Sequence, residues 1–179
     1  MGRTRTIMAL VIVLRGVSVI TGSADPTLWS LSSGGNGHYY QYVSTPTRWV
    51  DARQDALSRD LNGLPGYLAT ITSEEENSFL LSLMPADIIQ AWTGGAEMGQ
   101  EGHWIWADGP EAGLPFWSGD QNGAPVNGAF TEWRPGAPDD LITDDAFMLA
   151  GPLNGSPGTW NDGSVAWHSG YLVEYSGAA

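Results

Sequence analysis

The sequence contains no cysteine and few basic side chains. Without cysteine there is no disulfide and no cysteine nucleophile, so packing alone must hold the fold together. The 7 basic residues stand against 20 acidic ones, and the net charge of −13 repels phosphate backbones and anionic lipid surfaces. A solubilising acidic surface explains most of this charge. Carboxylates that cluster repel one another unless a cation lies between them, so the balance also favours a metal.

Long apolar runs are also missing, and no segment after residue 24 is apolar enough to cross a bilayer. Residues 1–24 are typical of a secretory signal: Arg3 and Arg5 precede an apolar run over 7–14, and small residues follow at 22–24. Arg15 limits the run to about eight residues, near the lower limit for such a signal. A mis-set start or a frayed leader is the alternative. We expect a signal peptide over 1–24 and one domain over 25–179, secreted or otherwise extracytoplasmic.

Motifs that mark common enzymes are absent as well. His38, His103 and His168 are far apart and lack the spacing of a zinc site. No nucleophile elbow or phosphate-binding loop occurs. Carboxylate pairs are compatible with a glycosidase, but here they gather with an amide and a proline turn, as in a metal cage. We therefore expect a domain that is not an enzyme, with an acidic-site hydrolase as a distant alternative.

Hydrophobic residues make up 42% of the 179-residue chain, which indicates a single globular domain. The first half predicts two strands alternating with two helices. The strands are expected at 39–43 and 67–71, the first helix between a Thr47 N-cap and Asn62-Gly63, and the second between a Ser73 capping box and Pro85.

The second half is dense in glycine and proline, which predicts loops with short strands between them. Strands are expected at 104–107, 146–150, 165–168 and 171–175, with the last pairing with the first. Such a long loop region is usually functional. Of its aromatic residues, Phe116 and Trp117 are the best candidates for an exposed surface that stacks on a sugar or contacts a partner. The other tryptophans are expected to fill the core or face the strands, namely Trp92, Trp104, Trp106, Trp133 and Trp167.

Six side chains that can offer oxygen ligands to a metal lie in one short region of the sequence. They lie in the stretch 136–140, in the pair Asp144-Asp145 and in Trp160-Asn161-Asp162. Hard cations such as calcium are held by several carboxylate and amide oxygens, so we look for the function here. The plainer alternatives are that Pro138 only shapes a turn and that Asn161-Asp162 forms an ordinary turn before Gly163.

The order of these pieces resembles the C-type lectin domain. The resemblance covers roughly residues 36 to 176. Other motifs of that family occur in the right order. They are Trp49-Val50-Asp51-Ala52, the stretch Gly66 to Glu76, Ala91-Trp92-Thr93-Gly94-Gly95, the stretch Trp104 to Gly109, Phe130-Thr131-Glu132-Trp133, and the stretch Gly170 to Tyr175. It implies an α+β fold of the C-type lectin-like type, with two helices flanking small antiparallel sheets and a long loop region.

The resemblance also implies two calcium sites. The principal one, which in the family also holds the sugar, would use Asp139, Asp144, Asn161 and Asp162, and these four are the expected carbohydrate-binding residues. The family has Glu or Gln at a fifth position, where this chain has Ala137. The auxiliary site would use four further carboxylates, Glu97, Glu101, Asp140 and Asp145, although Glu97 and Glu101 taken alone are explained as solvated loop charges.

Two disulfides of the family would fall at Ala56 with Val173 and at Ala146 with Val165. Small apolar residues at all four positions predict packed methyl groups in place of the bridges. The expected function is calcium-dependent carbohydrate binding, with Ca2+ as cofactor and a glycan or an extracellular protein as partner. The alternative, favoured by Ala137, is a protein-recognition or adhesion module of the same fold with structural calcium and no sugar binding.

Overall fold

The structure of the chain is a computed structural model that describes residues 23–139 and 145–177. Residues 1–22 of the predicted signal peptide, Asp140 and Asp144 therefore lie outside the described residues, as does the side chain of Asp145. No helix among the described residues is long and apolar enough to span a bilayer.

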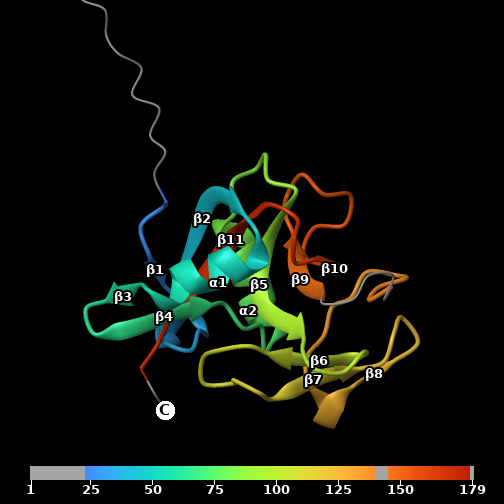
Figure 1. Cartoon of the computed structure of the whole chain (residues 1–179). Coiled ribbons are helices and arrows are strands. Elements are labelled where there is room, and N and C mark those ends of the chain that lie inside the picture. The colour runs from blue at the N-terminus through green and yellow to red at the C-terminus, as the bar shows by residue number, and fades with distance from the viewer. Residues whose placement is uncertain (1–22, 140–144, 178–179) are drawn as a thin grey trace, which may run out of the picture.

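Two α-helices and eleven strands are connected in the order shown in Figure 1. The helices are α1 (Trp49–Leu57) and α2 (Glu74–Leu83). The strands are β1 (Thr27–Leu28), β2 (Tyr39–Thr47), β3 (Asp60–Leu61), β4 (Leu64–Leu68), β5 (Gln90–Glu97), β6 (His103–Trp106), β7 (Pro115–Ser118), β8 (Ala124–Pro125), β9 (Asp145–Ala150), β10 (Trp160–Ser164) and β11 (Ser169–Tyr175). Two short 3-10 helices lie at Leu31–Ser33 and Val126–Gly128. The α+β class is confirmed.

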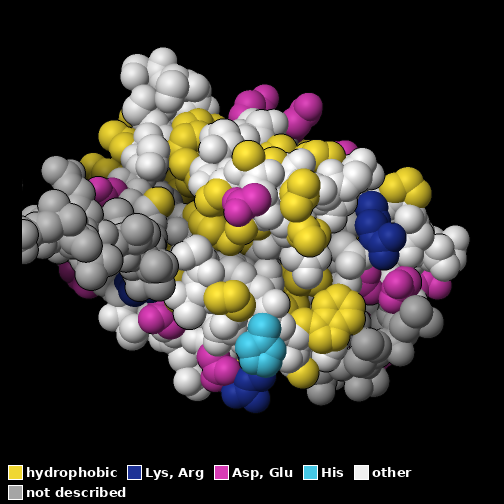
Figure 2. Space-filling view, turned by 90° about the horizontal axis from the view of Figure 1, so that it is seen from above, with side chains coloured by type: hydrophobic (Ala, Val, Ile, Leu, Met, Phe, Trp, Pro, Cys, Tyr) yellow, Lys and Arg dark blue, Asp and Glu magenta, His cyan; other side chains and the backbone are white. Residues whose placement is uncertain are grey.

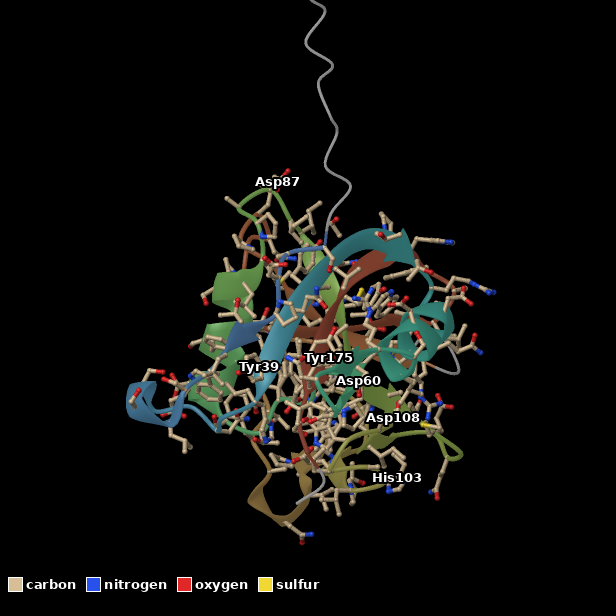
Figure 3. The ribbon with its side chains drawn as sticks, turned by 90° about the vertical axis from the view of Figure 1, so that its left-hand side faces the viewer. Tyr39, Asp60, Asp87, His103, Asp108 and Tyr175 are labelled. Atoms are coloured by element: carbon tan, nitrogen blue, oxygen red, sulfur yellow. The ribbon has the colours of Figure 1, made fainter. Side chains whose placement is uncertain are left out.

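The last strand, β11, is the centre of the sheet. It pairs antiparallel with β2, as the sequence predicted, and Tyr39 and Tyr175 are register partners that Figure 3 shows close together. It also pairs antiparallel with β4 and parallel with β5, so the sheet is mixed rather than purely antiparallel. From β5 the sheet branches, to β6, β7 and β8 on one side and to β9 and β10 on the other.

Two hydrophobic clusters form the core. The cluster with α1 contains Ala52 and Ala56, and the one with α2 contains Leu80 together with most of the large aromatic residues. The residues expected at the two lost disulfides, Ala56, Val173, Ala146 and Val165, all belong to the α1 cluster. Packed aliphatic side chains therefore stand where bridges were expected, as predicted.

Several local predictions are confirmed and others are wrong. Ser73 caps α2, because its hydroxyl accepts a hydrogen bond from the Glu76 backbone N–H. Thr47 is not an N-cap: β2 runs through Thr47, and α1 starts after Arg48 without a side-chain cap. The strand predicted at 165–168 is also wrong, because that segment forms a turn and the strand lies at Trp160–Ser164.

The expected aromatic contact surface is wrong as well. Phe116 is only 1% exposed and Trp117 only 9%, because β7 pairs with β6 and turns both rings into the aromatic cluster. Trp167, expected in the core, is 47% exposed instead. Glycine and proline in the flanking turns thus suggested an open loop, whereas the two aromatic residues lie in a strand.

Candidate functional site

The loop that carries Asp139 is held against the start of β10. The backbone N–H of Arg134 donates to the carbonyl of Trp160 at 3.0 Å, and the N–H of Trp160 donates to the carbonyl of Glu132 at 2.7 Å. Trp160 itself is fully buried and stacks on Phe147. The loop is thereby fixed to a strand whose next two residues are Asn161 and Asp162.

This arrangement brings two of the predicted ligands together. The Asp139 backbone N–H donates to Oδ2 of Asp162 at 2.7 Å, just after the cis peptide bond between Ala137 and Pro138. Asp162 is 5% exposed, and its backbone pairs with Phe147 of β9. Two residues that are 23 positions apart in sequence therefore lie side by side.

Asn161, the third predicted ligand, is held by a neighbour that the sequence analysis did not single out. The Nε of Arg134 donates to Oδ1 of Asn161. Both residues line a cavity of about 170 Å³ between the loop and the β9–β10 hairpin. The signal in the sequence was that Arg134 has no acidic residue three or four positions away, unlike Arg48 and Arg59. The fourth predicted ligand, Asp144, lies outside the described residues.

Position 137 is buried, and its side chain has no oxygen donor. Ala137 is 4% exposed, and its backbone N–H donates to the Arg134 carbonyl at 3.0 Å. A methyl group therefore occupies a packed corner of the loop at the position where the resembling family carries a ligand.

The auxiliary site is described only in part. Glu97 ends β5 and is 7% exposed, and its Oε1 accepts a hydrogen bond from the Gly102 backbone N–H. Glu101 is exposed in the turn between β5 and β6. Since Asp140 and the Asp145 side chain are not described, the assembly of these four carboxylates stays a prediction. Within residues 23–139 and 145–177, no three His, Asp or Glu side chains gather in a group able to hold a metal.

A second group of acidic residues lies inside the fold. Glu76 from α2 and Glu174 from β11 are 2% and 1% exposed, and the Tyr40 hydroxyl donates to Glu76 at 2.5 Å and approaches Glu174 at 3.2 Å. His38 Nδ1 lies 2.6 Å from Glu174. The hydrogen bond to Glu174 raises the pKa of His38, and burial raises the pKa of Glu76.

The backbone N–H and the hydroxyl of Thr72 donate to Glu76, and those of Thr70 donate to Glu174. Each of the two carboxylates is thus supplied with donors by the fold itself. This cluster joins α2, β2 and β11, and it serves the fold rather than a ligand.

Comparison with known proteins identifies the fold that carries this site. No family model matches the chain. Halomucin of Haloquadratum walsbyi is 36% identical over 156 residues, which cover 83% of this chain and 2% of halomucin. The alpha-N-acetylgalactosamine-specific lectin of Patiria pectinifera is 28% identical over 79% of this chain and 76% of its own length.

Solved structures share the architecture. The C-type lectin CEL-I of Cucumaria echinata aligns with a TM-score of 0.59 at 23% identity, over 79% of this chain and 91% of CEL-I. The chain is a C-type lectin-like domain. A Ca2+-dependent type II antifreeze protein, solved without Ca2+, aligns with a TM-score of 0.62 at 20% identity over 85% of this chain and 98% of its own. A calcium-independent type II antifreeze protein aligns at 0.57 and 20% identity, over 86% and 95%.

Apart from halomucin, the relatives and structural neighbours named above are lectins and antifreeze proteins, and the prediction of a non-enzymatic domain is confirmed. The chain covers only a small fraction of halomucin, so the activity of that whole protein is not carried over. The calcium-dependent and calcium-independent neighbours share one fold, so the need for calcium rests on individual residues.

Proposed function

We propose that this domain is a secreted module that binds carbohydrate with the help of calcium. The observation that supports it most directly is the hydrogen bond of 2.7 Å between the Asp139 N–H and Asp162 Oδ2, with Asn161 next to it. Two carboxylates and an amide on a fixed loop and strand are the ligand type that calcium prefers. The named lectins among the relatives support the sugar.

The residues present suit calcium, because the Asn161 oxygen has two lone pairs and keeps one of them when it accepts from Arg134. Asp139, Asn161 and Asp162 supply oxygen donors, and the prediction adds Asp144 as the fourth ligand. Bound calcium supplies a positive charge to which neutral sugar hydroxyls can coordinate. The chain's own residues fix the donors: Trp160 anchors the strand, and the loop hydrogen bonds orient Asp139.

Calcium that binds only the folded state stabilises it by mass action, by about 2.7 kcal/mol at a concentration of about 100 times Kd. We expect the melting temperature to rise when calcium replaces chelator. Magnesium at the same concentration controls for ionic strength. An unchanged melting temperature rejects both calcium sites, and calorimetric titration counts the sites that bind.

The second candidate is a protein-recognition or adhesion module with structural calcium and no sugar binding. The buried methyl group of Ala137 favours it, because no oxygen donor is available at that corner of the loop. A glycan array read with and without chelator separates the two functions. Calcium-dependent glycan signals support the lectin, whereas calcium-dependent melting with a blank array supports the recognition module.

A further inference from the structure

Arg134 differs from every other described arginine in having no carboxylate partner among the residues that the structure describes. The three others among residues 23–139 and 145–177 form ion pairs at 2.6–2.7 Å, and their partners are Asp51 for Arg48, Asp108 for Arg53 and Asp55 for Arg59. The Arg134 guanidinium donates instead to a neutral amide oxygen, that of Asn161. In a chain with a net charge of −13, a cation left without a carboxylate needs an explanation.

The cavity next to Arg134 is lined by neutral polar groups. Gln90, Asn154, Thr159 and Asn161 supply the polar wall and Met148 part of the apolar wall, and no acidic residue of the described chain lines it. Figure 2 shows that acidic side chains are spread over one whole face of the molecule, with few basic ones between them. The cavity is thus a local exception on an acidic protein.

Two amide residues that line the cavity use their acceptor oxygens in hydrogen bonds within the protein, so mainly donor groups remain for a ligand. A guanidinium has no acceptor, so Asn161 must turn its oxygen to Arg134, and its amide nitrogen remains. The Asn154 oxygen accepts from the Ser156 N–H at 3.1 Å, which leaves that amide nitrogen as well. With Nε engaged, Arg134 keeps its two terminal nitrogens for a second, forked contact.

We propose that this cavity binds the carboxylate or sulfate group of an acidic sugar, held by Arg134, while the sugar ring lies at the predicted calcium site that shares Asn161 with the cavity. The inference rests on the proposed carbohydrate binding and narrows it to glycans with a negative charge. Its volume of about 170 Å³ suits one charged substituent. Pockets for whole drug-sized ligands are larger, about 300 Å³ or more.

Because the domain is strongly negative overall, recognition of an acidic sugar must depend on the residues of this cavity. An anion is repelled by most of the surface, so non-specific attraction cannot bring an acidic sugar to the domain. Any preference for an acidic over a neutral sugar must come from a site with a cation and donors. Asn161 joins that site to the predicted calcium site, because it belongs to both.

A glycan array with two matched series tests the inference. One series carries galactose, galactose 6-sulfate and galacturonic acid, and the other glucose, glucose 6-sulfate and glucuronic acid. The unmodified domain, Arg134→Gln, Arg134→Lys and the control Arg48→Gln are compared in calcium. Arg48 is an exposed arginine paired with Asp51 on α1, and it does not line the cavity. Thermal melts check that each variant folds.

We expect at least one acidic sugar to bind roughly tenfold more tightly than its neutral parent, as a charge-assisted forked contact provides. Arg134→Gln should remove the preference, Arg134→Lys should retain part of it, and Arg48→Gln should leave it intact. Preference for the sulfated or the carboxylated member identifies the anion. Equal binding of acidic and neutral sugars, or a preference that survives Arg134→Gln, rejects the inference and leaves the proposed function standing. If no sugar binds to the unmodified domain, the proposed function fails as well.

Discussion

Two pairs of acidic residues, each joining distant parts of the chain, have opposite surroundings. Glu76 and Glu174 lie inside the fold and receive hydrogen bonds from Tyr40 and from two threonines. Asp139 and Asp162 meet at the edge of the long loop region, and Asn161, the neighbour of Asp162 in sequence, lines a cavity together with an arginine. A carboxylate surrounded by donors of its own fold stabilises that fold, whereas one next to an open polar cavity is placed for a ligand.

The largest expected effect is on the buried pair. Glu174→Ala removes the acceptor of the Thr70 N–H and the partner of His38. Breaking such a buried network lowers the free energy of unfolding by about 3–5 kcal/mol. Urea titration measures it, with the exposed Glu75→Ala on α2 as control. Similar denaturation midpoints for the two variants would show that the buried pair does not hold the fold.

A smaller effect on stability, with a large one on binding, is expected at the loop pair. Asp162→Ala leaves the Asp139 N–H without its acceptor and lowers the free energy of unfolding in chelator by about 1–3 kcal/mol. Calcium affinity and any calcium-dependent glycan signal should be lost. Calorimetry and the array measure this, with Asp87→Ala as control, since Asp87 is an exposed carboxylate at the tip of a loop (Figure 3) and is not one of the predicted ligands. A full calcium-dependent signal in Asp162→Ala would place the sugar site elsewhere.

The smallest expected effect is a pH dependence of the melting temperature, caused by His38 and Glu76 in the buried cluster. The pKa of His38 is raised above its ordinary 6.5, so its stabilising contact is fully present below about 6.5 and is lost as pH rises through the folded value. The pKa of Glu76 is also raised, so the cost of burying its charge appears as pH rises. The melting temperature should therefore fall between about pH 6 and pH 8. In His38→Gln the slope should be shallower, and an equal slope in both proteins would exclude His38 as its source.

Parts of the fold were predictable because short-range rules govern them. The capping of α2 depends on Ser73 and the residue three positions on, and both are visible in the sequence. The strand at Trp160–Ser164 was missed because Asn161-Asp162-Gly163 has the composition of a turn, and only pairing with β9 makes it a strand. Tertiary pairing overrides local preference there.

The candidate site was predictable in its residue types and less so in its contacts. The predicted ligands Asp139, Asn161 and Asp162 follow from the sequence pattern, and a loop hydrogen bond brings Asp139 to Asp162. The contact between Arg134 and Asn161 was not predicted, because the two residues are 27 positions apart and meet only in the folded chain. The burial of Phe116 likewise depends on the pairing of β7 with β6, which glycine-rich flanks concealed.

The position of β11 has a consequence for synthesis of the domain. This strand holds β2, β4 and β5 together, yet it is the last of the strands to be made. A nascent chain therefore cannot complete the sheet until residues 169–175 have left the ribosome, and its most distant contact in sequence, between β2 and β11, forms only then. Contacts of large sequence separation slow folding. We therefore expect the aromatic segments that these contacts bury to stay exposed during translation, when the chain can bind chaperones.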